Sequence, residues 1–231
     1  MAVQDTTRRR VLAWFAKPRI MKMRSIGSVV AMLIEALCDA VFDRWYRLDF
    51  GGVIEQADLS TNQHASHANA VRYEAVAGID LRVVVSEALR VGQTIDSFLD
   101  LGSGKGKSCL YVAQSFGFKK ILGIEFSAQL IEIAMANKSR LKTQNVDFVL
   151  ADAAQYKMLP TPTIVHMYNP FDAEILEAFL TNNMEHFRSH GSVIAYVNDR
   201  NRSSLSKFGF ETVYRDQTRK LSVYRLPDPT G

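Results

Sequence analysis

The sequence predicts an α/β fold in which helices cover both faces of a mostly parallel sheet. Short apolar runs typical of buried strands alternate with helical patterns from residue 97 onward. A glycine-rich stretch joins the first of these runs to a helix. The last two runs, Phe210–Arg215 and Lys220–Leu226, are separated by a polar turn and form a predicted hairpin. The final strand is therefore expected to be antiparallel to its neighbours.

Composition limits the class of protein. The chain has 231 residues, of which 47% are hydrophobic, and this is enough for one domain with a sizeable core. Cys38 and Cys109 lie in apolar helical patterns without metal-ligand spacing, so both are expected to be reduced core residues of a cytoplasmic protein. Neither a metal site nor a disulfide framework is predicted. The net charge is +4, but seven basic residues stand against one acid before residue 25, so the basicity belongs to this first segment.

The N-terminal part of the chain is expected to differ from the rest. Residues 1–24 are predicted to be a basic flexible tail, and residues 25–92 a helical extension. Apolar residues recur from Ile26 to Trp45 with the spacing of one helix face, and their uncharged stretch is too short to cross a bilayer. This helix is expected to pack on the rest of the chain or on a second subunit. The alternative is that residues 1–46 bind an anionic membrane surface or a protein partner, with nucleic acid less favoured.

The rest of the extension holds weaker signals. A polar loop and two more helices are expected, at residues 60–67, 69–75 and 81–91. His64 and His67 lie in the loop, but no third ligand of matching spacing accompanies them, so they are interpreted as loop histidines.

Strand and helix patterns alternate after residue 93, as a parallel α/β sheet requires. The expected strands are 97–101, 120–125, 146–150, 163–168, 191–198, 210–215 and 219–225, and the expected helices are 105–116, 127–142, 172–187 and 201–207.

One stretch organises this region. Gly102, Gly104 and Gly106 follow a buried strand in a G-x-G-x-G pattern, with Lys107 where the dinucleotide fingerprint would place its third glycine. A tight glycine turn lets the backbone approach a ligand at the N-terminus of the following helix. About twenty residues later, a second apolar run ends on Glu125, whose carboxylate can accept hydrogen bonds from ribose hydroxyls. The pattern predicts a site for a nucleoside-like cofactor.

The stretch Leu99–Gly106 and the run ending on Glu125 resemble the first two motifs of class I S-adenosylmethionine (SAM) dependent methyltransferases. The resemblance covers residues 93–226. It implies a doubly wound, seven-stranded, mostly parallel sheet with an antiparallel last strand, and a SAM-binding domain over residues 93–231. It also implies transfer of a methyl group from SAM, with S-adenosylhomocysteine as the product.

The same resemblance implies roles for single residues. Gly102 and Gly104 would let the methionine part of SAM approach the backbone, Asp100 would carry charge toward its ammonium group, and Glu125 would hold the ribose. Asp152 matches the position that accepts a hydrogen bond from the adenine amino group, or else it caps the turn that follows. The cofactor-binding candidates are Asp100, Gly102, Ser103, Gly104, Glu125, Phe126, Asp152, Ala153 and Asn169.

A third motif concerns the methyl acceptor. Asn169, Pro170 and Phe171 resemble the Asn-Pro-Pro-Tyr or Asn-Pro-Pro-Phe motif of methyltransferases that act on planar nitrogens, and the shorter form is similar to some bacterial class I enzymes. In that motif the Asn oxygen and a backbone carbonyl accept hydrogen bonds from an amine, while the aromatic ring packs against it. These three residues are the catalytic candidates, and the implied acceptor is a nitrogen of a protein side chain or another amine. The alternative is a turn whose proline only ends the strand.

Two other functions stay open. O-methylation of a glycan or a lipid-linked substrate at the membrane surface would need a general base, for which His166 and His64 are the candidates. A non-catalytic SAM-binding partner subunit would be expected to lose the acids Asp100, Glu125 and Asp152, which are all present. The expected location is cytoplasmic, at the inner face of the membrane where lipid is bound.

Overall fold

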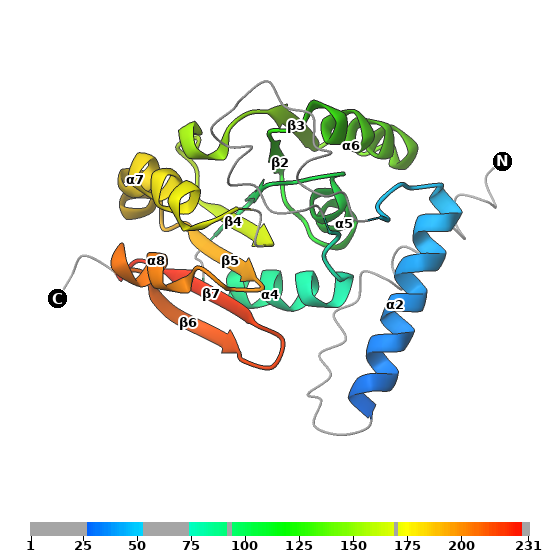
Figure 1. The fold of residues 1–231 in the computed structure, drawn as a ribbon, viewed down its shortest axis with the longest axis horizontal. Helices are drawn as coiled ribbons and strands as arrows, with labels where there is room; N and C mark the ends of the chain where they lie inside the picture. The colour runs from blue at the N-terminus through cyan, green and yellow to red at the C-terminus, as the bar shows by residue number, and fades with distance from the viewer. Residues whose placement is uncertain (1–26, 53–73, 92–93, 169–170, 228–231) are drawn as a thin grey trace.

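A computed structural model describes residues 27–52, 74–91, 94–168 and 171–227 of the chain. Within these ranges, the side chains of residues 27–33 and 35 are also left out of the description. Figure 1 shows a central sheet with helices packed against it and one long helix, α2, at the side of the molecule.

The sheet has seven strands in the order β3-β2-β1-β4-β5-β7-β6. β1 to β5 pair in parallel, whereas β7 is antiparallel to both β5 and β6. The predicted mostly parallel sheet with an antiparallel last strand is confirmed, and β7 lies inside the sheet rather than at its edge. The strands are β1 Ser97–Leu101, β2 Lys120–Glu125, β3 Val146–Leu150, β4 Thr163–Tyr168, β5 Val193–Val197, β6 Glu211–Asp216 and β7 Leu221–Arg225.

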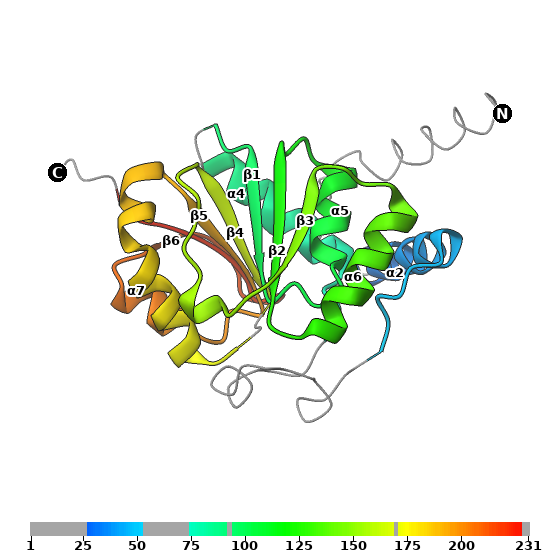
Figure 2. The same ribbon diagram turned by 90° about the horizontal axis from the view of Figure 1, so that it is seen from above.

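Helices cover both faces of the sheet, as Figure 2 shows. One face carries α4, α5 and α6, and the other carries α7 and α8. A short 3-10 helix, η2, follows β3. The bounds are α4 Gly78–Val91, α5 Lys107–Ser115, α6 Ala128–Leu141, η2 Ala153–Gln155, α7 Ala173–His190 and α8 Arg202–Lys207.

Local signals explain where these helices begin and end. Ser127 caps α6 by accepting a hydrogen bond from the Leu130 N–H. Asp172 caps α7 in the same way, and Gly191 ends that helix in the left-handed conformation (φ 60°). The helix expected at 105–116 begins only at Lys107, because Gly106 still belongs to the turn and has φ +83°.

Alternation along the strands divides the interior into two cores. In β1, Phe98 lies in the core beneath α4 and α5, whereas Leu99 and Leu101 lie in the core beneath α7 and α8. The adjacent strand β4 alternates in register with β1, so that Asp100 is paired with His166. This register brings two ionisable side chains to the α5 face of the sheet.

The N-terminal helix α2 spans Gly27–Tyr46, and its Asp39 carboxylate contacts the sheet domain. Asp39 accepts a hydrogen bond from the Gly78 N–H at the start of α4 (3.0 Å) and pairs with Lys107 Nζ of α5 (3.2 Å). Cys38 was expected in the core, but it is only half-buried in α2, while Cys109 is fully buried in α5.

The apolar face of α2 was expected to pack on the rest of the chain or on a second subunit. Four of its large side chains, Ile34, Leu37, Val41 and Trp45, are exposed and so do not pack on the described part of this chain. One other expectation for this region needs correction. The expected helix at 69–75 is wrong for residues 74 and 75, which precede α4 without regular structure. The rest of that helix and the expected loop at 60–67 lie outside the described residues.

A search of the described helices for a stretch long and apolar enough to cross a bilayer finds none.

Candidate active site

The predicted cofactor residues gather where the carboxyl ends of parallel strands meet. The glycine turn 102–106 follows β1, Glu125 ends β2, and Asp152 comes two residues after β3. β2 lies between β1 and β3, so these strand ends are neighbours. In open α/β sheets this edge is where ligands bind.

The turn itself is built from glycines in left-handed conformations. The φ angles of Gly102, Gly104 and Gly106 are 74°, 53° and 83°. The N–H groups of Gly102 and Ser103 both donate to the Ile124 carbonyl at 2.9 Å, which fastens the turn to β2. A polar atom is left over here, since Ser103 Oγ is buried and has no hydrogen-bond partner among the described residues. A polar ligand at the turn would satisfy it.

The ring of Phe148 in β3 packs against the turn at Gly106 and against Gly123 of β2. The sequence pattern did not predict this contact. A Cβ placed on Gly106 would lie 2.5 Å from Phe148 Cζ, and one on Gly123 would lie 2.6 Å from Phe148 Cδ1. The two glycines therefore leave the space that this aromatic ring fills.

Glu125 is buried and braces the turn. Its carboxylate accepts hydrogen bonds from the N–H groups of Gly104 (2.9 Å), Phe126 (2.9 Å) and Ser127 (3.0 Å). Burial raises the pKa of Glu125 above its ordinary value, and the three N–H donors act in the opposite direction. Three donors leave one lone-pair position of the two carboxylate oxygens for a ligand hydroxyl.

Asp152 acts as a cap in the structure. Its Oδ1 accepts a hydrogen bond from the Ala154 N–H at 2.9 Å, at the start of η2. Both Asp152 and the neighbouring Ala153 are buried. The capping alternative is confirmed, and the contact with adenine stays a prediction about the second carboxylate oxygen.

Asp100 is turned toward the α5 side of the sheet. Its Oδ1 lies 2.6 Å from His166 Nδ1, and Cys109 Sγ lies 3.9 Å from its Oδ2. His166 is completely buried and its ring stacks on Phe98 at 5.7 Å between centroids. Burial, and then the nearby Asp100 carboxylate, raise the pKa of Cys109 well above its ordinary value. Asp100 thus has a partner within the core, and its role toward SAM stays a prediction.

Of the three catalytic candidates, only Phe171 is described. It is buried beside α7, and its carbonyl accepts a hydrogen bond from Asn201 Nδ2 at 3.1 Å. Asn169 and Pro170 lie outside the described residues. Phe171 comes three residues after the carboxyl end of β4, the edge of the sheet where the glycine turn also lies.

Sequence reasoning missed three residues that attach the N-terminal segment to the turn. Lys105 is buried within the turn, and its Nζ contacts Asp49 Oδ1 at 2.7 Å and the Gly51 carbonyl at 2.6 Å. Asn137 of α6 exchanges two hydrogen bonds with the Asp49 backbone and donates a third to the Lys105 carbonyl (3.1 Å). The only sequence signal was the lysine between two turn glycines.

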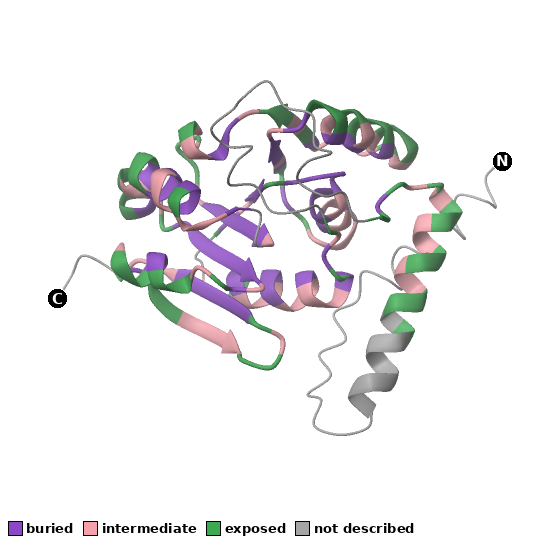
Figure 3. Cartoon of the chain, viewed as in Figure 1, coloured by how far each residue is buried: buried purple, intermediate pink, exposed green. Residues whose placement is uncertain are grey.

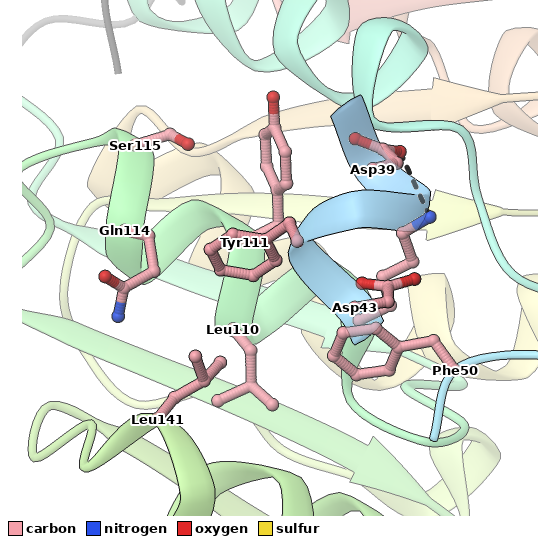
Figure 4. Close-up of a pocket in the computed structure, with 10 residues that line it drawn as sticks. Asp39, Asp43, Phe50, Leu110, Tyr111, Gln114, Ser115 and Leu141 are labelled. Carbon is pink, nitrogen blue, oxygen red and sulfur yellow. Dashed lines mark hydrogen bonds and ion pairs between the residues drawn. The ribbon is translucent and has the colours of Figure 1, made fainter. Parts of the chain in front are cut away.

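A separate hollow lies between α2, α5 and α6 (Figure 4). Its walls are mostly apolar and include Phe42, Phe50 and Tyr111, and the Asp39–Lys107 pair lies at one side. Burial raises the pKa of Asp43, which lines this hollow, to about 6. The space of about 30 Å³ has room for one or two water molecules.

Comparison with known proteins agrees with this geometry. Residues 95–200 match the family described as a methyltransferase domain. The chain is 32% identical over 88 residues to the probable (S)-tetrahydroprotoberberine N-methyltransferase 2 of Papaver bracteatum. This match covers 35% of the chain and 24% of that protein, so the chain spans about a quarter of the length of this curated relative.

Solved structures resemble the chain at low identity. A protein of the NADB-Rossmann superfamily from Streptococcus agalactiae is 15% identical, with a TM-score of 0.51 over 69% of this chain and 72% of that one. A ribosomal protein L11 methylase from Lactobacillus delbrueckii subsp. bulgaricus is 13% identical, with a TM-score of 0.47 over 64% of this chain and 80% of that one. The streptococcal likeness shows a shared Rossmann-like fold. Residues 95–200 therefore match a methyltransferase domain and have a Rossmann-like fold.

Proposed function

We propose that this chain is a methyltransferase that transfers a methyl group from SAM to a nitrogen atom, on a protein side chain or another amine. When bound, SAM supplies a methyl group on a positively charged sulfur, which an acceptor lone pair attacks in line. The chain has to bind the cofactor, aim the acceptor and exclude water.

The observation that carries the choice of nitrogen concerns His166. An oxygen acceptor needs a base to take its proton, whereas the lone pair of a neutral amine attacks directly. His166 was the described candidate for that base, but it is completely buried and its Nδ1 is engaged by Asp100 at 2.6 Å. Its ring lies on the α5 side of the sheet, within the core, and not at the edge proposed to bind SAM. The named activity of the poppy relative, an N-methyltransferase, supports the same choice.

The proposed cofactor contacts follow from the geometry of the edge. Gly102 and Gly104 would let the methionine part of SAM approach the backbone, and the orphan Ser103 hydroxyl would gain a partner. Glu125 would accept from a ribose hydroxyl with its remaining lone-pair position. Asp152 would accept from the adenine amino group with the carboxylate oxygen that does not cap η2.

The proposed acceptor contacts belong to the segment after β4. The Asn169 side-chain oxygen would accept a hydrogen bond from the amine and so turn its lone pair toward the methyl group. Pro170 would hold the turn, and the Phe171 ring would pack beside the acceptor. The end of β4 lies next to the end of β1, where the glycine turn begins, and this supports the assignment.

We also propose a cytoplasmic location. Cys109 is a buried free thiol, as is usual in a reducing compartment. We also propose a position at the inner face of the membrane. The exposed residues of α2, described in the next subsection, support this part of the proposal.

Turnover with labelled SAM tests the nitrogen assignment. Amine-bearing peptides, nucleic acids, glycans and lipids are offered as acceptors, and the methylated atom is identified by fragmentation mass spectrometry. Asn169→Ala is expected to lower turnover by about 100-fold, the penalty for misplaced reacting groups, with little change in the affinity for S-adenosylhomocysteine. Methylation on oxygen, or wild-type turnover by Asn169→Ala, would refute the assignment.

His166→Gln serves as the companion variant. It removes the only described candidate base while keeping a side chain that can bond to Asp100, so turnover per folded molecule is expected to be retained. A large loss of turnover together with a changed pH–rate profile would instead make His166 a base and favour oxygen.

A further inference from the structure

Four large apolar side chains of α2 are exposed. Ile34, Leu37, Val41 and Trp45 are 50%, 65%, 52% and 77% exposed. Their spacing of three and four residues puts them on one side of the helix, and Figure 3 shows exposed positions along the side of α2 that faces away from the sheet domain. We call these four residues the α2 outer face.

The charges of α2 are segregated in an unusual way. The acids with described side chains, Asp39 and Asp43, are half-buried and turned toward α5, where Asp39 pairs with Lys107 at 3.2 Å. The other exposed residues between 34 and 47 are Ala36, Ala40, Arg44 and Arg47. The exposed side of α2 therefore carries apolar and cationic groups and no described acid. A helix designed only to cover the sheet domain would show the opposite arrangement, with its apolar side inward.

The sequence before α2 adds to this charge. Residues 1–24 hold seven basic residues and one acid, and they are joined to the same helix by two residues. A basic segment next to an exposed apolar helix face is the combination that binds anionic lipid, because charge attracts the segment while apolar side chains enter the headgroup region.

We propose that the α2 outer face, flanked by Arg44 and Arg47, binds an anionic lipid bilayer and lies in its surface without crossing it. Charge complementarity favours lipid over a second copy of this chain. Two copies joined through this face would bring their arginines together without a described acid on that face to pair with them. This surface is separate from the cofactor edge, so binding to lipid is independent of the nature of the methyl acceptor.

Trp45 provides a direct probe of the proposal. The chain has two tryptophans, so Trp14→Phe in the full-length protein leaves Trp45 as the only one. Vesicles of phosphatidylcholine with added phosphatidylglycerol are expected to shift Trp45 emission to the blue at low salt, and bromine on the acyl chains is expected to quench it. Vesicles of phosphatidylcholine alone are expected to do neither, and high salt should reverse the binding.

Matched variants separate this face from other apolar surface. Leu37→Ser is expected to lower vesicle partitioning about tenfold or more, the scale for losing one buried leucine. Leu159→Ser removes a leucine of similar exposure (46%) in the loop before β4 and should change nothing. Arg44→Gln is expected to lower partitioning about fivefold. All variants should bind S-adenosylhomocysteine like the parent protein, which shows that they are folded.

Three results would overturn the proposal. One is co-sedimentation with anionic vesicles without a blue shift, since the basic tail alone would then bind. Another is equal partitioning of Leu37→Ser and the parent protein. The third is a blue shift that depends on protein concentration without vesicles, because the face would then join two copies of the chain.

Discussion

Asn137→Ala tests how the N-terminal segment is held against the glycine turn. Asn137 is completely buried in α6 and makes three hydrogen bonds to backbone groups of two distant segments. It accepts from the Asp49 N–H and donates to the Asp49 carbonyl, both at 3.0 Å, and it donates to the Lys105 carbonyl at 3.1 Å. Alanine removes all three bonds without adding a group that could clash. The Asn137 oxygen also accepts from Arg140 Nη1 (3.1 Å), but Arg140 is exposed, so losing this contact adds little.

The magnitude follows from these contacts. At about 1 kcal/mol for each neutral hydrogen bond, the free energy of unfolding should fall by about 3 kcal/mol. In a protein of this size that is a drop of about 6–12 °C in Tm. The bond to the Lys105 carbonyl lies within the turn itself, so losing its share of about 1 kcal/mol should also weaken S-adenosylhomocysteine binding about fivefold.

Calorimetry measures both quantities, by thermal unfolding and by titration with S-adenosylhomocysteine. Asn145→Ala is the control, because Asn145 donates one hydrogen bond to the Phe118 carbonyl (2.8 Å) at the amino ends of the strands, far from the turn. It should lower Tm by about 2–4 °C and leave the affinity unchanged. The reasoning is refuted if Asn137→Ala is no less stable than Asn145→Ala, or if both lose affinity equally.

Three further outcomes are expected. Gly106→Ala should lower the free energy of unfolding by at least about 1–2 kcal/mol, because Gly106 has a left-handed φ of +83°. Adding Phe148→Leu should restore only part of this loss, since it relieves the 2.5 Å contact but not the backbone strain. Full recovery of stability in chemical denaturation would contradict this. Asp100→Ala should lower the free energy of unfolding by about 3–5 kcal/mol, because it leaves His166 without its partner in the core. The double variant Asp100→Ala, His166→Leu should recover part of that loss. If the single and double variants are equally destabilised, the pair is not the cause. Burial raises the pKa of Asp43 from 3.8 to about 6, so its ionisation destabilises the native state as the pH rises between these values. Asp43→Asn should therefore raise the free energy of unfolding at pH 8 by about 1–2 kcal/mol after allowance for solvent screening, and by almost nothing near pH 4. If the gain in free energy were the same at both pH values, it would have another cause.

Much of the sheet domain could be predicted from local sequence. Glycines in a turn and an acid at the end of a strand are local signals, so Gly102–Gly106 and Glu125 were assigned to the edge where the structure places them. The alternation of strands and helices predicted the parallel sheet, because each crossover has to return the chain to the same end.

Contacts between distant segments could not be predicted in the same way. Asp100 and His166 are 66 residues apart, and they meet because β4, after a crossover, pairs with β1 on the side away from β2. Lys105 and Asp49 are 56 residues apart, and no periodicity connects them. For α2, the spacing of apolar residues identified one face of the helix but could not say which way it points. Asp39 fixes that direction through partners on α4 and α5.

The place of β7 in the sheet has a consequence for synthesis of the protein. β7 lies between β5 and β6, so β6 cannot join the sheet until Leu221–Arg225 has left the ribosome. Until then β5, every residue of which is buried in the finished fold, has an open edge of unpaired backbone groups. A nascent chain halted before residue 221 would expose that edge to other chains and aggregate. Protection of the β5 edge on this side therefore depends on Leu221–Arg225, which follows both β5 and β6 in the chain.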